Sequence, residues 1–358
     1  MKIVTVVGTR PQFIKCGPLS RELRKVAIEV LVHTGQHYDE NMSDVFFREL
    51  DIPCPDYHLG VGSGSHGAQT GEMLGKVEEV LLSEHPDYVL VYGDTNSTVA
   101  GALAAAKLNI PVIHVEAGLR SFNRRAPEEI NRVIVDHVST FLFCPTTTAV
   151  NNLVAEGITQ GVHLVGDVMY DALCHNLRTA ERTSRVLERL RLHPRAYLLA
   201  SVHRAENTDR PDNLGNILRA FTALVEPGQT VVFPVHPRTR ERLRELGEDR
   251  HANLLTIAPV SYFDMLVLEK NAKIILTDSG GVQREAYWLR VPCVTLRDET
   301  EWVETVAAGW NTLAGTDPYS IVAATKRLAP PAANLLRYSG DCSRRILKVL
   351  RQATGLFS

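Results

Sequence analysis

Short, almost continuously apolar runs alternate with longer stretches of mixed polarity along the whole chain. Such continuous hydrophobicity is typical of strands that helices cover on both faces. The alternation predicts βαβ units and parallel sheets. In the first half the runs lie at residues 2–8, 30–35, 87–94, 111–118 and 141–145, with a further candidate at 163–167. In the second half they lie at 196–203, 230–236, 253–259, 272–281 and 292–296.

The stretches between these runs contain the predicted helices. Residues Thr98–Leu108 are rich in Ala and Leu, and Ala205–Val225 follows a polar strand end. The segment Tyr338–Ala353 has a helical pattern again. A basic, polar helical stretch, Arg178–Arg191, separates the two sets of apolar runs. We therefore predict an α/β protein with two similar open sheets, one after the other.

Length supports the same division. A chain of 358 residues is too long for one compact core, and two α/β domains are the natural expectation. We place an N-terminal Rossmann-like domain at residues 1–170 and a C-terminal Rossmann-like domain at residues 171–358.

Composition excludes several classes of protein. A formal net charge of −2 and a pI of about 6.7 give no overall basic field that would attract nucleic acid or anionic lipid. The sequence has no run of about 20 apolar residues that would predict a membrane span. The apolar segment Ile3–Val7 is too short for a signal peptide, so a cytoplasmic protein is expected.

Neither the cysteines nor the histidines predict a metal or a redox site. The six cysteines include no CxxC pair, and most lie beside apolar residues, so reduced and partly buried thiols are expected. His33 and His37 are four residues apart, but their segment reads as strand and loop, not as helix. No metal site and no cofactor are therefore expected, apart from a divalent ion that a diphosphate could carry.

Polar side chains gather where the predicted strands end. In open α/β sheets, ligands bind outside the carboxyl ends of the strands. A structural protein needs turn residues there, but not repeated His, Arg and carboxylate side chains. The pattern therefore predicts an active-site cleft. The segments are Gly8–Pro11, Gly35–His37, Gly93–Asn96, Glu116–Gly118, Ser201–Asn207, His236-Pro237 and Asp278–Gly281.

The first of these segments is a candidate for anion binding. Arg10 and Lys15 lie at the start of a helix that opens near Pro11, and a helix N-terminus favours anions. The segment is neither a GxGxxG fingerprint nor a Walker loop. The alternative is that Arg10 is a capping or surface charge.

Ser279, Gly280 and Gly281 are a stronger candidate for phosphate binding. Two glycines after a buried strand allow backbone N–H groups to approach an oxyanion at the start of the next helix. Glu285 lies about one turn into that helix, where it could accept hydrogen bonds from ribose hydroxyls. A tight turn without a ligand is the alternative.

Carboxylates are the candidates for acid and base chemistry. Asp94 and Glu116 end neighbouring strands of the prediction, and paired carboxylates in different surroundings can divide these roles. Glu128 and Glu129 lie among several arginines. For Glu129 a structural ion pair is the favoured interpretation.

Two histidines complete the candidate set. His203 and His236 both lie at strand ends, and His203 is flanked by the polar sequence SVHRAEN. A lone histidine is more often structural, so the polar surroundings of His203 make it the stronger candidate.

An ordered series of segments resembles the non-hydrolysing UDP-N-acetylglucosamine 2-epimerases over roughly residues 2–315. The segments are GTRPQFIK, TGQHYD, VYGDTNST, HVEAGLRS, PEEINR, SVHRAEN, HPRT and TDSGGVQREA. The resemblance implies a glycosyltransferase-B fold with the active site in an interdomain cleft. It also implies that the last helix packs back on the N-terminal domain, and that the protein is a homodimer.

The resemblance further implies a mechanism. UDP is eliminated across the C1–C2 bond to give a 2-acetamidoglucal and adds back after a proton returns to the opposite face of C2. No cofactor is needed. The matching positions are the catalytic carboxylates Asp94, Glu116 and Glu128, the catalytic histidine His203, the basic residues Arg10 and Lys15, the diphosphate loop Ser279, Gly280 and Gly281, the ribose ligand Glu285 and the nucleotide-side histidine His236.

Some positions depart from the usual family pattern. Gln12 stands where many members have Glu, which removes a negative charge near Arg10. Segments 60–71 and 297–306 look more like the branch that acts on UDP-2,3-diacetamido-hexuronic acids, so that substrate remains the alternative to UDP-N-acetylglucosamine. Gln36 and His37 keep part of the allosteric-site pattern of some members. The rival functions are a glycosyltransferase, a hydrolysing epimerase and a catalytically idle UDP-sugar sensor.

Overall fold

The computed structural model describes residues 1–36, 50, 52–225, 229–235, 237–245, 254–327 and 340–354. The chain divides into two compact units, one of Met1–His175 with Tyr338–Ser358 and the other of Asn176–Arg337. The first unit thus continues to His175, beyond the expected boundary at 170, and it includes the C-terminal helix. Each unit is an α/β domain with one parallel sheet.

The first unit contains a seven-stranded sheet in the order β3-β2-β1-β4-β5-β6-β7. Every strand pair in it is parallel. The strands are β1 (Lys2–Val7), β2 (Ile28–His33), β3 (Tyr57–His58), β4 (Tyr88–Tyr92), β5 (Val112–Val115), β6 (Phe141–Cys144) and β7 (Val162–Leu164). The helices are α1 (Arg10–Leu23), α3 (His66–Glu84), α4 (Asn96–Lys107), α5 (Pro127–Val138), α6 (Thr147–Ala155), α16 (Cys342–Thr354) and α7 (Val168–Thr183), which begins in this unit.

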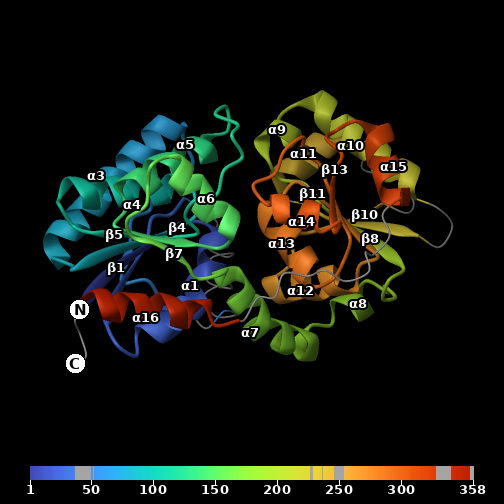
Figure 1. The fold of residues 1–358 in the computed structure, drawn as a ribbon. Coiled ribbons are helices and arrows are strands. Elements are labelled where there is room, and N and C mark those ends of the chain that lie inside the picture. The colour runs from blue at the N-terminus through green and yellow to red at the C-terminus, as the bar shows by residue number, and fades with distance from the viewer. Residues whose placement is uncertain are drawn as a thin grey trace. The chain divides into compact units, whose positions relative to one another are not determined.

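Helices cover both faces of this sheet, as the apolar runs predict. Figure 1 shows α3, α4 and α5 on one face and α1 and α16 on the other. Val77 of α3, Val99 of α4 and Val135 of α5 join a buried cluster with Val4 and Val6 of β1. Burial of apolar surface on both sides stabilises a sheet whose strands carry few polar side chains.

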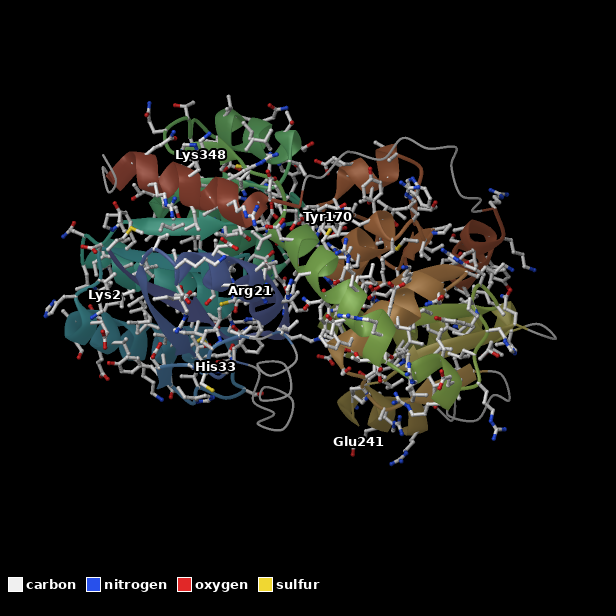
Figure 2. The ribbon with its side chains drawn as sticks, turned by 90° about the horizontal axis from the view of Figure 1, so that it is seen from below. Lys2, Arg21, His33, Tyr170, Glu241 and Lys348 are labelled. Carbon is white, nitrogen blue, oxygen red and sulfur yellow. The ribbon has the colours of Figure 1, made fainter. Side chains whose placement is uncertain are left out.

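The C-terminal helix α16 packs against α1 and is capped by an acidic residue of α7. Asp171 accepts hydrogen bonds from the backbone N–H of Cys342 (3.1 Å) and of Ser343 (2.8 Å) and from the Ser343 hydroxyl (2.8 Å). These bonds satisfy N–H groups that a helix N-terminus leaves unpaired. Lys348 of α16 is exposed and points away from the unit (Figure 2). The expected start at Tyr338 lies outside the described residues.

The second unit contains a six-stranded parallel sheet in the order β10-β9-β8-β11-β12-β13. Its strands are β8 (Tyr197–Ser201), β9 (Thr230–Pro234), β10 (Leu254–Ile257), β11 (Ile274–Thr277), β12 (Cys293–Thr295) and β13 (Asn311–Leu313). Its helices are α8 (Val186–Arg189), α9 (Ala205–Thr208), α10 (Pro211–Leu224), α11 (Pro237–Glu245), α12 (Tyr262–Asn271), α13 (Gly280–Trp288), α14 (Val303–Ala307) and α15 (Pro318–Arg327).

One face of the second sheet carries a large apolar core. Leu214 and Phe221 of α10, Leu243 of α11 and Ile321 of α15 pack on strand residues such as Leu276. Figure 1 shows α12 and α13 on the opposite face. Helices on both faces of this sheet again explain the continuous apolar runs of the sequence.

The predicted fold class is confirmed, and the differences are local. The single helix predicted over Ala205–Val225 is wrong, because the chain forms α9 and then α10. Pro211 opens α10, where its missing N–H costs no hydrogen bond, and the preceding residue is extended. The short strands β3 and β13 were not predicted, because two or three residues give too little pattern to recognise.

None of the helices in the described part of the chain is long and apolar enough to cross a membrane. Within those same residues, no group of three or more His, Cys, Asp or Glu side chains could hold a metal ion. All six cysteines are free thiols; Cys54 and Cys174 are exposed and the others are buried.

Candidate active site

In the first unit the strand order reverses between β1 and β4, and ligands of open α/β sheets bind at such a switch point. The loops after β1 and β4 begin with Gly8 and Gly93. A Cβ atom on Gly8 would lie 2.1 Å from Thr34 Oγ1 and 2.2 Å from Ser97 Oγ, so only glycine fits there. Close approach of these loops concentrates the predicted polar residues at one end of the sheet.

Gln12 joins the two loops. Its Oε1 accepts hydrogen bonds from the backbone N–H of Gly8 (2.8 Å) and Thr9 (3.1 Å). Its Nε2 donates to the carbonyl of Tyr92 (3.0 Å) and to Thr98 Oγ1 (2.9 Å). In the sequence, Gln12 was notable only because it removes a negative charge near Arg10. The structure shows that the amide is buried and needs both its donor and its acceptor.

Lys15 is buried and forms an ion pair with the half-buried Glu116, with Nζ and Oε2 2.7 Å apart. Both side chains lie against Gly93: a Cβ there would be 3.2 Å from Lys15 Nζ and 3.7 Å from Glu116 Oε1. Glu116 has φ of +76°, a conformation that is costly for a residue other than glycine. The predicted Lys15 and Glu116 are therefore brought together beside the loop that carries Asp94.

Asp94 is half-buried and pairs with Arg132 of α5. Its backbone carbonyl accepts a hydrogen bond from Asn131 Nδ2 at 2.9 Å. Arg132 Nη1 also lies 3.1 Å from Glu129 Oε2. The ion pair with Arg132 fixes the Asp94 side chain in place.

The adjacent glutamates of α5 have different surroundings. Glu129 is buried and accepts hydrogen bonds from the backbone N–H of Ser121 (2.9 Å) and Phe122 (2.9 Å), which supports its structural interpretation. Glu128 is half-buried in the first turn of α5 and has no hydrogen-bond or ion-pair partner among the described residues. Of the two glutamates, Glu128 is the one whose carboxylate the described residues do not engage, which fits its place as the proton-transfer candidate.

In the second unit the strand order reverses between β8 and β11, and His203 and Asp278 follow these two strands. Asp278 is fully buried and accepts from the backbone N–H of His203 (3.2 Å) and Arg204 (3.1 Å) and from Asn207 Nδ2 (3.0 Å). Burial raises the pKa of Asp278, but His203 and the hydrogen bonds together hold this pKa below its ordinary value.

Asp278 also orients the ring of His203. His203 Nδ1 lies 3.2 Å from Asp278 Oδ1, while 57 % of the histidine side chain is exposed. Because the carboxylate accepts the Nδ1 proton, Nε2 is left to exchange a proton with a ligand. The sequence places Asp278 at a polar strand end but does not indicate its partner, since His203 lies 75 residues away in the chain.

The diphosphate-loop candidates open α13. Ser279 is the N-cap residue, and its Oγ accepts from the backbone N–H of Val282. A Cβ on Gly280 would lie 2.3 Å from Glu301 Oε1 and 3.2 Å from Trp302 Nε1, so any larger residue there would displace the Glu301 carboxylate. The N-terminus of α13 offers backbone N–H groups to an anion.

Glu285 lies on the same helix and is buried. The hydroxyl of Tyr262 donates to Glu285 Oε1 at 2.9 Å, and the Tyr262 ring is itself buried. This contact fixes the glutamate rotamer.

The remaining predicted residues are Arg10, His236 and His37. Arg10 is the first residue of α1 and is half-buried, whereas His236 and His37 lie outside the described residues.

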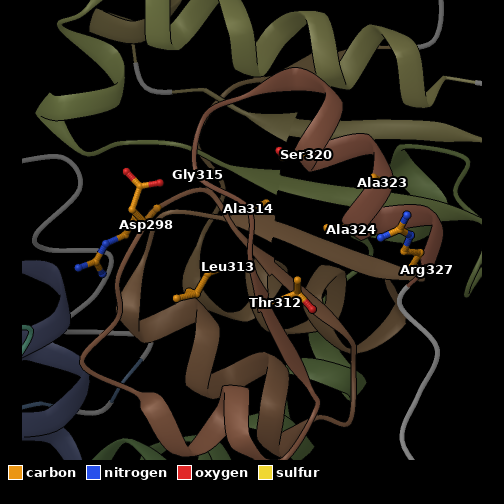
Figure 3. A pocket seen from close by; sticks show the side chains of 10 residues that line it. Asp298, Thr312, Leu313, Ala314, Gly315, Ser320, Ala323, Ala324 and Arg327 are labelled. Atoms are coloured by element: carbon orange, nitrogen blue, oxygen red, sulfur yellow. The ribbon is translucent and has the colours of Figure 1, made fainter.

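Arg297 and Asp298 line a cavity of about 540 Å³ in the second unit (Figure 3). It lies between the end of β13 and α15, with Gly315, Ser320 and Arg327 on its wall. None of the site residues predicted from the sequence is among those that line it.

Two doubly wound parallel sheets, each with polar side chains at its switch point, define a nucleotide-binding α/β enzyme. Residues 21–351 match the family described as UDP-N-acetylglucosamine 2-epimerase, so the chain belongs to this family and is a UDP-sugar 2-epimerase, an isomerase. The family resemblance of the sequence is confirmed.

Three similar proteins illustrate the relationship. A "UDP-N-acetylglucosamine 2-epimerase homolog" of Methanococcus maripaludis is 56 % identical over 98 % of this chain and 99 % of its own. The "UDP-2,3-diacetamido-2,3-dideoxy-D-glucuronate 2-epimerase" of Pseudomonas aeruginosa is 49 % identical over 88 % of each chain. The crystal structure of Methanocaldococcus jannaschii UDP-GlcNAc 2-epimerase in complex with UDP-GlcNAc and UDP has a TM-score of 0.93 at 45 % identity, covering 98 % of this chain and 100 % of the other.

Proposed function

We propose that this enzyme interconverts UDP-N-acetylglucosamine and UDP-N-acetylmannosamine without net hydrolysis. The observation that carries the proposal is the grouping of Lys15 and Glu116 against Gly93, directly before Asp94. A sugar-binding protein without turnover has no need of two carboxylates held beside the same loop, each by its own cation, whereas removal and return of a proton at C2 require such groups.

The reaction balances as an elimination followed by an addition. A base takes the proton from C2 while the C1–O bond breaks, and the electron pair of the C–H bond forms the C1–C2 double bond as UDP leaves. Return of a proton to the opposite face of C2 and attack of the UDP oxygen on C1 complete the inversion. Asp94, Glu116 and Glu128 supply the carboxylates that exchange the proton.

The second unit binds the nucleotide in this proposal. Ser279, Gly280 and Gly281 bind the diphosphate at the N-terminus of α13, and Glu285 accepts hydrogen bonds from the ribose. His203, held by Asp278, exchanges a proton with the departing and returning diphosphate. Removal of one contact to a developing oxyanion commonly costs about 3 kcal/mol of transition-state stabilisation. Arg10, Lys15 and His236 complete the proposed set of binding residues.

A UDP-2,3-diacetamido-2,3-dideoxy-hexuronic acid is the second candidate substrate. The similarity to the Pseudomonas aeruginosa enzyme favours it. So does the divergent segment 297–306, in which Trp302 is buried and lies under the guanidinium of Arg284, 3.9 Å from the ring centroid. Replacement of one substrate by the other leaves the chemistry at C2 unchanged.

Proton NMR of each UDP-sugar with the enzyme in D₂O tests the proposal. The expected result with UDP-N-acetylglucosamine is UDP-N-acetylmannosamine with deuterium at C2 and no accumulation of free sugar. Exchange only with the diacetamido uronate would assign the second substrate. Steady release of free N-acetylmannosamine would identify a hydrolysing enzyme, and no exchange with either sugar by a UDP-binding preparation would refute an epimerase.

The location, the oligomeric state and the biosynthetic role of the enzyme are part of the same proposal. We expect a cytoplasmic homodimer that supplies an activated sugar for polysaccharide biosynthesis. Light scattering of the purified protein tests the dimer, since a monomeric mass at micromolar concentration would exclude it.

A further inference from the structure

His114 of β5 is fully buried, and both of its ring nitrogens are engaged. Nδ1 lies 2.7 Å from Asp136 Oδ1, and Nε2 lies 2.8 Å from the carbonyl oxygen of Gly93. A carbonyl oxygen and an ionised carboxylate can only accept hydrogen bonds, so both ring nitrogens must donate. The arrangement therefore calls for a doubly protonated, positively charged ring inside the first unit.

Asp136 of α5 provides the counter-charge. Its Oδ2 accepts from Arg120 Nη1 at 2.7 Å and from the backbone N–H of Gly118 at 3.1 Å. Burial raises the pKa of Asp136, but His114 and Arg120 together hold this pKa below its ordinary value. Arg120 is paired a second time, with Glu156 at 2.6 and 2.7 Å, so two cations meet two carboxylates. A buried charge is tolerated when it is paired and hydrogen-bonded in this way.

The paired charges hold both loops that carry proposed catalytic carboxylates. Gly93, whose carbonyl accepts from His114, has φ of +64° and immediately precedes Asp94. Gly118, whose N–H donates to Asp136, lies two residues after Glu116, which is itself in a left-handed conformation. Such unfavourable backbone conformations persist only where the surrounding contacts determine them.

We propose that His114 is a positioning residue: its charged ring, together with Asp136, fixes the Gly93–Asp94 and Glu116–Gly118 loops in the geometry needed for inversion at C2. This inference rests on the proposed function for its catalytic consequence, but not for the protonation of the ring. The hydrogen-bond partners of His114, Asp136 and Gly93, are not among the proposed nucleotide ligands, so its role is separate from nucleotide binding.

The first test is neutron crystallography of the unmodified protein after exchange into D₂O. The expected nuclear density shows deuterium on both Nδ1 and Nε2 of His114. Deuterium on only one of them, with the proton on Asp136, would overturn the charged-ring inference whether or not the enzyme is an epimerase.

The second test compares His114→Gln with the control His163→Gln. His163 of β7 lies in the same sheet, and its ring makes no hydrogen bond to the described residues. We expect His114→Gln to lower kcat about 100-fold, because a displacement near 1 Å has an effect of that size. The dissociation constant of UDP should stay within about twofold of the wild-type value, and the control should keep wild-type kcat.

Hydrogen exchange gives a readout that does not depend on activity. Amides of residues 93–96 and 116–119 should exchange faster in His114→Gln than in the wild type and in the control, while peptides of the second unit remain unchanged. Unchanged exchange in both loops would overturn the positioning role. A wild-type enzyme that turns over no UDP-sugar would instead refute the proposed function, and the neutron and exchange results would still decide the inference about His114.

Discussion

Replacing Asp278 with Asn would test how the second unit prepares His203. Asp278 is fully buried, and its two oxygens accept from two backbone N–H groups, from Asn207 and from His203 Nδ1. Asn has the same shape but only one acceptor oxygen. If that oxygen still accepts the hydrogen bonds from the Arg204 N–H and from Asn207, the new NH₂ group faces His203 Nδ1. Nδ1 must then accept a hydrogen bond instead of donating one.

The substitution should lower both the stability of the protein and its kcat. Loss of a hydrogen bond to a charged group lowers the free energy of unfolding by about 1.5–3 kcal/mol. The reversed tautomer places the single ring proton on Nε2 of His203, so the ring no longer exchanges a proton with the diphosphate. General acid–base catalysis contributes about 10²- to 10⁴-fold to a rate, and kcat should fall within this range.

The assay is the initial rate of UDP-sugar epimerisation, with urea unfolding and UDP calorimetry on the same preparations. Asp317→Asn is the matched control, because Asp317 accepts from the backbone N–H of Ser320 at 2.7 Å in the same unit but outside the proposed site. The control should keep wild-type kcat. A folded Asp278→Asn enzyme with kcat within about threefold of wild type would refute the orienting role of Asp278.

Three further outcomes are expected. Asp94→Asn should still bind UDP but lose epimerisation in the NMR assay, and near-normal turnover would remove Asp94 from the mechanism. Gly280→Ala should weaken UDP binding in calorimetry at least tenfold, about 1.4 kcal/mol, because its Cβ would lie 2.3 Å from Glu301 Oε1, whereas Gly281→Ala has only Ser279 Oγ at 3.8 Å and should bind normally. Asp136, whose pKa is lower in the folded than in the unfolded state, stabilises the protein above about pH 4, and this contribution is lost as pH falls through the folded-state pKa. Urea unfolding between about pH 6 and pH 3 should therefore show a smaller loss of stability for Asp136→Asn, and parallel pH profiles would contradict the assignment.

Much of the fold could be predicted because its signals are local. Each long apolar run became a strand, and the glycine-rich strand ends became the loops at the two switch points. The failures were local too: Pro211 divided a predicted helix, and β3 and β13 were too short to recognise. Candidate site residues were found for the same reason, since polar side chains directly after buried strands stand out in the pattern.

The contacts that give those candidates their chemistry could not be predicted in this way. Asp278 lies 75 residues from His203, Asp171 lies 172 residues from Ser343, and Gln12 lies 80 residues from Tyr92. Nothing in the sequence pairs His114 with Gly93 and Asp136, which its ring joins in the structure.

The sequence by itself determined the α/β class, the strands, their polar ends and the family to which the chain belongs. Hydrophobic pattern and turn chemistry depend on near neighbours in the chain, and these can be read from the sequence. Only the tertiary structure decided which strand ends lie side by side, which carboxylate faces which cation, and which glycine is required by lack of space. These features depend on strand order and on packing between distant segments, which the polarity of each segment does not specify.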